Sequence, residues 1–151
     1  MCGICGVFNY AGTSSEVSAG FIKEMSDEMT HRGPDDDGLF LSNDRKLGLG
    51  FRRLSIVDLA GGHQPMANED ETVWIVFNGE IYNHLELRET LKAKGHIYKT
   101  RSDTESIIHL YEEYGVEETL KRINGMFAFA IWDKAEGRMI LARDRIGKKP
   151  L

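Results

Sequence analysis

The sequence has few of the features on which membrane, secreted and disulfide-rich proteins depend. Its 151 residues include only two cysteines and three prolines. The longest uninterrupted apolar run, Met126 to Trp132, is far shorter than the roughly 20 residues of a membrane helix. No basic segment followed by an apolar stretch opens the chain, so we expect no secretory signal, no membrane contact, a cytoplasmic location and free thiols.

Charge and motif content exclude further classes of protein. The net charge of -5, with no cluster of lysine or arginine, argues against a nucleic-acid partner. The chain has no phosphate-binding loop and no glycine fingerprint between a strand and a helix, so this segment should bind neither ATP nor a dinucleotide. We also predict no metal site, because the five histidines show no short pairing with each other or with the cysteines.

The remaining composition is that of one globular domain spanning residues 1–151. With 41% hydrophobic residues, the chain has enough apolar surface to form a core. Short β-branched and aromatic segments predict strands over 4–8, 38–44, 46–58, 72–79, 125–133 and 138–144. Apolar spacings of three and four predict helices over 14–33, 83–95, 102–115 and 116–123. This order predicts an α+β fold with helices on the outer faces of its sheets.

Capping residues set the expected ends of these helices. Ser14 or Ser15 should cap the first helix, and Gly33 should end it. Glycines should also end the second and third helices, at 95 and 115. Two capping boxes, pairs of side chains three residues apart at a helix start, are expected: Asn83 with Glu86, and Ser102 with Glu105.

The cysteines near the start of the chain allow three interpretations. Cys2 and Cys5 have CxxC spacing, but a redox pair needs a helix after its first thiolate, and a zinc ribbon needs a second such pair. Cys2 is otherwise a buried structural residue or the first residue of the mature chain. In that last case, removal of Met1 joins a thiol of pKa about 8.5 and an α-amine of pKa about 8 on one residue. The amine can then act as the general base.

Residues farther along the chain fit an amino-acid substrate. Asn78-Gly79 is either a hairpin turn or the end of a buried strand, where the side-chain amide and the backbone N–H can hold an oxyanion. Arg53 and Asp103 are each ordinary, as a strand residue and as an anion in the first turn of a helix. Together their side chains match the carboxylate and the ammonium group of a free amino acid.

Several segments carry a family resemblance when they are taken together and in order. They are Cys2-Gly3-Ile4, HRGPD at 31, RLSIVD at 53, HQPM at 63, NGEIYNH at 78, SDTE at 102, GMFAFAIWD at 125 and ARDRIGKKPL at 142. With them, nearly the whole chain resembles the glutaminase domain of glutamine-hydrolysing asparagine synthetases. The resemblance implies the fold of class II glutamine amidotransferases, a four-layer αββα N-terminal nucleophile hydrolase sandwich of two antiparallel sheets flanked by helices.

The resemblance also implies a reaction at one end of L-glutamine. Cys2 is the nucleophile and its freed amine is the base. Asn78 and Gly79 form the oxyanion hole. The thiolate attacks the side-chain amide, ammonia leaves, and water hydrolyses the resulting thioester to glutamate.

The other end of L-glutamine is held, by the same resemblance, through its charges. Arg53 binds the α-carboxylate, while Glu80 and Asp103 bind the α-ammonium group. The backbone of four residues forms the adjoining wall: Leu54, Ser55, Ile56 and Val57. Two positions depart from the family pattern. Arg101 replaces a common glycine and should narrow the rim of the pocket, and Cys5 replaces a larger apolar residue.

Finally, the resemblance implies a longer protein. Family members continue with further strands and with a synthetase domain that uses ATP and magnesium to make asparagine from aspartate and the released ammonia. Residues 1–151 would be a truncated glutaminase domain with unpaired final strands and no cofactor of its own. A homodimer is compatible with the family. The alternatives are an amidotransferase with another acceptor and a non-catalytic module that only binds glutamine or a partner.

Overall fold

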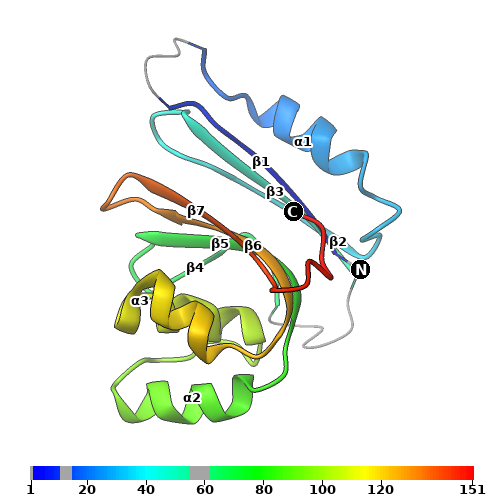
Figure 1. The fold of residues 1–151 in the computed structure, drawn as a ribbon. Helices are drawn as coiled ribbons and strands as arrows, with labels where there is room; N and C mark the ends of the chain where they lie inside the picture. The colour runs from blue at the N-terminus through cyan, green and yellow to red at the C-terminus, as the bar shows by residue number, and fades with distance from the viewer. Residues whose placement is uncertain (1, 11–14, 55–61) are drawn as a thin grey trace.

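Two antiparallel sheets pack face to face, and helices cover the outer face of each sheet (Figure 1). The computed structural model describes residues 2–10, 15–54 and 62–151. In chain order the elements are β1 (Gly3–Phe8), α1 (Ala19–Asp27), β2 (Asp36–Leu41), β3 (Leu47–Arg53), β4 (Met66–Ala67), β5 (Val73–Ile81), α2 (His84–Ala93), α3 (Asp103–Arg122), β6 (Gly125–Asp133) and β7 (Arg138–Arg143). Within the described ranges, one sheet has the order β1-β3-β2 and the other β4-β5-β6-β7. The predicted four-layer sandwich is confirmed.

The strand β3 shows why the first sheet can be covered on both faces. Leu47, Leu49 and Phe51 belong to the core cluster between the sheets and are at most 1% exposed. Alternate residues point to opposite faces of a strand, so Gly48 faces α1. An added Cβ at Gly48 would lie 2.5 Å from Ile22 Cγ1. The missing side chain therefore lets α1 lie directly on the strand.

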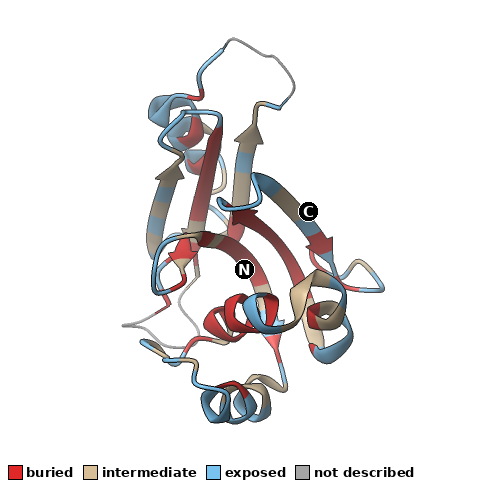
Figure 2. Cartoon of the chain, turned by 90° about the vertical axis from the view of Figure 1, so that its left-hand side faces the viewer, coloured by how far each residue is buried: buried red, intermediate tan, exposed pale blue. Residues whose placement is uncertain are grey.

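A larger core lies between the second sheet and the helices α2 and α3. Figure 2 shows β5 and β6 as almost continuously buried strands. Fully buried side chains of this core include Ile75, Ile81, Leu91, Ile107 and Phe129. The helix α3 bends where the sequence predicted a helix end, because the backbone at residue 115 has a φ of 73°. None of the helices in the described part of the chain is both long and apolar enough to cross a lipid bilayer.

The strand β5 extends beyond its predicted end. Asn78 and Gly79 pair with Ala128 and Phe127 of β6, and pairing continues to Ile81. The hairpin-turn alternative for Asn78-Gly79 is therefore wrong, and so is the prediction that the strand ends there. The error arose because the partner strand β6 lies more than forty residues away along the chain, beyond the reach of a local pattern.

The first helix is shorter than predicted at both ends. Ser18, not Ser15, caps α1, because its hydroxyl accepts a hydrogen bond from Phe21 N at 3.1 Å; Ser14 lies outside the described residues. The backbone of Ser18 is extended (φ -94°, ψ 145°), so the helix cannot continue before it, and the preceding Val17 donates its N–H to Arg45 O. The predicted end at Gly33 is also wrong, since α1 ends at Asp27 and turns follow it.

The predicted capping boxes form only in part. Asn83 does not cap α2 through its side chain, which instead donates to Arg122 O and accepts from Asn124 N, both at 2.9 Å. Ser102 does cap α3, because its hydroxyl accepts from Thr104 N. Glu105 bypasses the cap and binds residues 99 and 100 instead. For Asn83, long-range hydrogen bonds have displaced the local cap, whereas Glu105 bonds to residues only five and six positions before it.

The strands β1 and β7 are edge strands of their sheets, and an apolar groove lies between them. Ile4 and Phe8 line the groove on one side and Met139 and Leu141 on the other. Leu141 remains 63% exposed. Exposed edges of this kind are open to pairing with further strands.

A buried histidine holds the segment that leads into α3. His109 is 1% exposed, and its Nδ1 lies 2.9 Å from a carboxylate oxygen of Glu112. Its Nε2 lies 3.9 Å from oxygens of both Glu105 and Glu69. Burial alone would lower the pKa of His109, but Glu105 and Glu112 outweigh burial and raise the pKa to about 9. The carboxylate of Glu105 also accepts from Lys99 N and Thr100 N, and despite burial its pKa falls to about 2.

These pKa values predict a window of pH in which the network stabilises the fold. The ordinary pKa of His109 is 6.5, so its contribution is complete below pH 6.5 and is lost as the pH rises through about 9. Glu105, with an ordinary pKa of 4.5, contributes fully above pH 4.5 and loses its contribution as the pH falls towards about 2. The pair should therefore stabilise the protein most between pH 4.5 and 6.5.

Urea unfolding of His109→Gln at several pH values tests this window. At pH about 5.5 the substitution should lower the free energy of unfolding by about 3 kcal/mol, because it removes one partner of a buried ion pair. At pH about 9.5 the loss should be much smaller, because His109 is then neutral in both states. The control His31→Gln, at an exposed histidine, should behave as the parent does. An equal loss at both pH values would contradict the assignment.

Candidate active site

One cavity opens where the core between the two sheets gives way to polar side chains. It has a volume of about 130 Å³. Residues two apart on a strand share a face, so each core row continues into the cavity. Arg53 follows Phe51 on β3, and Asn78 follows Val76 on β5. Cys2 lies just ahead of β1, two residues before Ile4. Because β1 and β3 are antiparallel, the start of one lies beside the end of the other. Residues far apart in the sequence therefore meet at one end of the sandwich.

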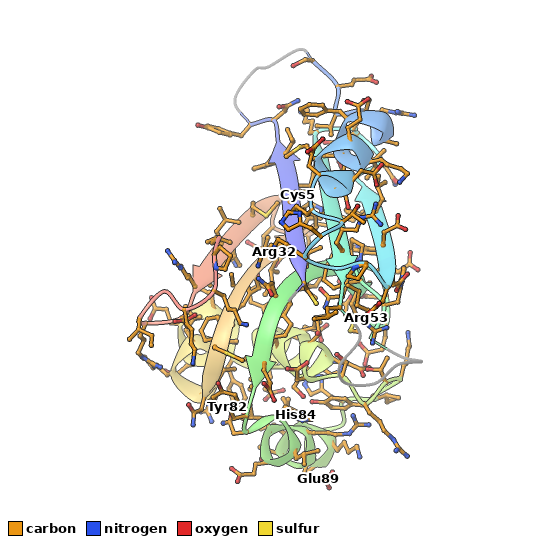
Figure 3. All side chains as sticks on the ribbon, turned by 90° about the vertical axis from the view of Figure 1, so that its right-hand side faces the viewer. Cys5, Arg32, Arg53, Tyr82, His84 and Glu89 are labelled. Carbon is orange, nitrogen blue, oxygen red and sulfur yellow. The ribbon has the colours of Figure 1, made fainter. Side chains whose placement is uncertain are left out.

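Cys2 lies at the entrance to β1 with its thiol in this cavity. Its Sγ is 3.9 Å from Leu54 O. Arg32 donates from Nε to Cys2 O at 3.2 Å, so the turn after α1 holds the backbone of the cysteine. Figure 3 shows Arg32 and Arg53 near the junction of the two sheets, whereas Tyr82, His84 and Glu89 lie around α2.

Cys5 points away from the cavity. Its Sγ lies 4.0 Å from Ile22 O of α1, on the opposite face of β1 from Cys2. Burial raises the pKa of the Cys5 thiol, which keeps it protonated and unreactive. Both cysteines are free thiols. Because the side chains of Cys2 and Cys5 point in opposite directions, they share neither a disulfide nor a metal site despite their CxxC spacing.

The register of β5 leaves one backbone N–H of the cavity without a partner in the described part of the chain. Even-numbered residues of β5 exchange backbone hydrogen bonds with β6. The bond from Tyr82 N to Asn124 O, just after the strand, continues this pattern. Odd-numbered residues face the other way, where β4 ends opposite Ile75. There Phe77 N donates to Gln64 Oε1 at 2.6 Å and Ile81 N donates to Asp103 Oδ2 at 2.8 Å.

Gly79 lies between these two bonded amides. No hydrogen-bond partner for its N–H is present among the described residues, and its partner residue on β6, Phe127, bonds instead to Asp144. An added Cβ at Gly79 would lie 2.2 Å from Met126 O, so only glycine fits this position. The side chain of Asn78 is 2% exposed, and its Nδ2 also has no partner in the described structure. Two donors of the cavity therefore have no partner among the described residues: the N–H of half-buried Gly79 and the amide of buried Asn78.

The charged residues predicted for the substrate also line the cavity. Arg53 is 6% exposed, and Glu80 and Asp103 lie with it on the cavity wall. Burial raises the pKa of Asp103, although the hydrogen bond from Ile81 N partly opposes this. Leu54 lines the cavity as predicted. The other predicted wall residues, Ser55, Ile56 and Val57, lie outside the described residues, as does Met1. Arg101 is exposed and does not line the cavity.

Three further residues were not predicted as part of the site. Gln64 and Lys149 line the cavity and are 4% and 7% exposed, and Arg32 binds the backbone of Cys2. All three belong to segments that carried the resemblance: HQPM, GKKPL and HRGPD. Membership of these segments was the signal available in the sequence, whereas the contacts that bring the residues to the site are tertiary.

A group of potential metal ligands lies elsewhere. His96, His109 and Glu112 have ligand atoms within 4.8 Å of one another, and none of them lines the cavity. His109 is already bonded to Glu112, and its raised pKa places a proton where a cation would bind. The absence of a metal remains a prediction.

Comparison with known sequences gives a match along the whole chain. Residues 1–151 match the family described as glutamine amidotransferase domain. Asparagine synthetase (glutamine-hydrolyzing) 1 of Bacillus subtilis is 51% identical over 154 residues, which cover 100% of this chain and 24% of that protein. Asparagine synthetase (glutamine-hydrolyzing) 3 of Arabidopsis thaliana is 46% identical over 151 residues, covering 100% and 25%. The chain thus spans about a quarter of the length of the curated relatives it matches.

Solved structures share the fold at lower identity. The glutamine phosphoribosylpyrophosphate amidotransferase from B. subtilis, complexed with ADP and GMP, has a TM-score of 0.72 and 20% identity over 93% of this chain and 37% of its own. A structure described as the allosteric regulatory enzyme of purine biosynthesis has a TM-score of 0.74 and 21% identity over the same shares. At these identities the likeness concerns the fold alone. From the match over its full length, this chain belongs to the glutamine amidotransferase domain family.

Proposed function

We propose that this chain hydrolyses L-glutamine to glutamate and ammonia through a thioester on Cys2. The observation that carries the proposal is a pair of donors with no partner among the described residues, the half-buried Gly79 N–H and the buried Asn78 Nδ2, in the same cavity as the thiol. Buried donors normally have partners. Here they are poised for a ligand oxygen, which is what acyl transfer to a nucleophile requires.

The reaction uses the N-terminal residue as both nucleophile and base. Once Met1 is removed, the α-amine of Cys2 accepts the thiol proton, and the thiolate attacks the side-chain amide carbon of glutamine. The carbonyl oxygen becomes an oxyanion that accepts hydrogen bonds from Gly79 and Asn78. The amide nitrogen takes the proton and leaves as ammonia. Water then attacks the thioester, and the thiol is regenerated as glutamate departs.

Charged residues of the cavity bind the part of glutamine that does not react. The guanidinium of Arg53 matches the α-carboxylate through two parallel hydrogen bonds. Asp103 uses Oδ2 for Ile81 N, which leaves Oδ1 for the α-ammonium group, with Glu80 beside it. Arg32 holds the backbone of Cys2 beside the site, and Leu54 lines it. The resemblance adds Ser55, Ile56 and Val57, which lie outside the described residues.

For the whole protein, we propose that the ammonia is used to make asparagine from aspartate. The support is the name shared by the curated relatives, each about four times as long as this chain. A synthetase domain after residue 151 would bind ATP and magnesium, and this segment would need no cofactor. Free thiols fit a cytoplasmic enzyme. The molecule that accepts the ammonia, and whether the protein forms a homodimer, would depend on the part of the protein beyond these residues.

Replacing the nucleophile tests the proposal. Cys2→Ala should reduce ammonia release from glutamine at least about a thousandfold, because no other thiol faces the cavity. Cys5→Ala is the matched control and should retain activity, since Cys5 faces α1. Glutamate and ammonia are measured together in a coupled assay, and the mass of the N-terminus shows whether Met1 has been removed.

Covalent labelling separates the two cysteines independently of turnover. A glutamine-mimicking diazo-ketone followed by peptide mapping should place the label on Cys2. Label on Cys5, or on neither residue, would overturn the mechanism. A parent protein that binds glutamine without releasing ammonia would instead indicate a non-catalytic module.

Substitutions at the charged residues should act on binding. Asp103→Asn and Arg53→Ala should each raise KM for glutamine by about tenfold or more with a smaller effect on kcat, because they contact groups that do not react. Arg101→Ala, at an exposed residue beside the site, is the control and should change KM little. A fall in kcat at unchanged KM would argue against the assigned roles.

A further inference from the structure

Gln64 connects the two elements that form opposite ends of the proposed glutamine site. It lies two residues before β4, and its side chain is 4% exposed. Oε1 accepts a hydrogen bond from Phe77 N of β5 at 2.6 Å. Nε2 donates to Thr104 Oγ1 of α3 at 3.3 Å. Both polar ends of one buried side chain are therefore used to join a strand to the start of a helix.

The two bonded residues adjoin the groups that would contact the substrate. Phe77 directly precedes Asn78 and Gly79, whose unused donors face the reacting amide in the proposed mechanism. Thr104 directly follows Asp103, which would bind the α-ammonium group. The position of Thr104 is itself fixed, because its backbone N–H and hydroxyl both bond to the hydroxyl of Ser102. A change in Gln64 would thus be transmitted to both ends of the site.

Few other hydrogen bonds fix this spacing on the β4 side of β5. The strand β4 pairs with β5 only at Trp74 and Ile75, before the site begins. Beyond that point, the hydrogen bonds to β5 on this side among the described residues come from the side chains of Gln64 and Asp103. Apolar side chains of β5 and α3 also pack together in the core. Of the two hydrogen-bonding side chains, Asp103 would also bind substrate, whereas Gln64 lines the cavity and ties the strand to the helix.

We propose that Gln64 is a positioning residue that sets the length of the amino-acid site and so makes it select glutamine over asparagine. The inference rests on the proposed glutaminase function. Asparagine carries the same three functional groups but is one methylene group shorter. With β5 and α3 held at a fixed separation, asparagine cannot place its ammonium group on Asp103 and its side-chain carbonyl oxygen on Gly79 together. A site of variable length would tolerate both.

The test compares glutamine and asparagine as substrates of Gln64→Met in the protein at its natural length. Methionine keeps the volume and the burial but can neither accept from Phe77 N nor donate to Thr104. We expect KM for glutamine to rise about tenfold, the effect of losing roughly one buried hydrogen bond, with a smaller change in kcat. The ratio of kcat/KM for glutamine to that for asparagine should fall by a similar factor.

Asn68→Leu is the matched control. Asn68 is also a buried amide next to β4, 5% exposed, and it binds the far end of β5 through Val73 N. Its loss should lower the melting temperature as Gln64→Met does, yet leave KM and the substrate ratio unchanged. Thr104→Val provides a second variant, because it removes the link from Nε2, together with the bond from the Ser102 hydroxyl, and keeps the bond of Gln64 to Phe77. It should shift the substrate ratio in the same direction and be non-additive with Gln64→Met.

The outcomes separate this inference from the function on which it rests. A parent that releases no ammonia from glutamine would overturn both. An active parent whose substrate ratio is unchanged in Gln64→Met and in Thr104→Val would overturn the role of Gln64 alone. An equal shift in Asn68→Leu would also overturn it, because general loss of stability would then explain the effect.

Discussion

The face-to-face packing of the two sheets is the constraint on which the site depends. Each inner face is apolar along most of its length, and the buried rows of β3 and β5 both end in a polar residue, Arg53 and Asn78. The antiparallel pairing of β1 with β3 brings Cys2 to the same end. A cavity forms there because polar side chains cannot fill the core as leucine and phenylalanine do. The chemistry therefore lies at the boundary of the packing that stabilises the fold.

Elements outside the sandwich act by fixing this boundary. The turn after α1 returns Arg32 to the carbonyl oxygen of Cys2. The network of Glu105 and His109 holds residues 99 and 100, just ahead of Asp103. The bond of Arg32 to Cys2 joins segments that are distant in the sequence. The ion pair of Glu105 and His109 buries two charged groups, where their interaction is stronger than in water. A helix on one side of the sandwich and a buried ion pair on the other thus serve the same cavity.

Local patterns predicted the α+β class and most of the helices and strands, because alternation and helical spacing report directly on burial. The four-layer arrangement and several of the proposed site residues followed from the family resemblance. The local patterns failed where a distant partner decided the outcome. The side chain of Asn83 bonds to Arg122 and Asn124 rather than to its own helix. The strand β5 continues through Gly79 because β6 pairs with it. Cys2, Asn78 and Asp103 were predicted from their chemistry, whereas Gln64 was missed because only tertiary contacts give it a role.

The N–H of Gly79, which has no partner among the described residues, has a consequence for recognition. In an antiparallel sheet, the N–H of this residue would meet a carbonyl oxygen from a neighbouring strand, but β4 has already ended. A bound carboxamide would supply that oxygen, so that the ligand completes the ladder as a short strand would. Sheet geometry would then set the direction of the hydrogen bond, and peptide-like molecules added along this edge would compete with an amino acid for the same position.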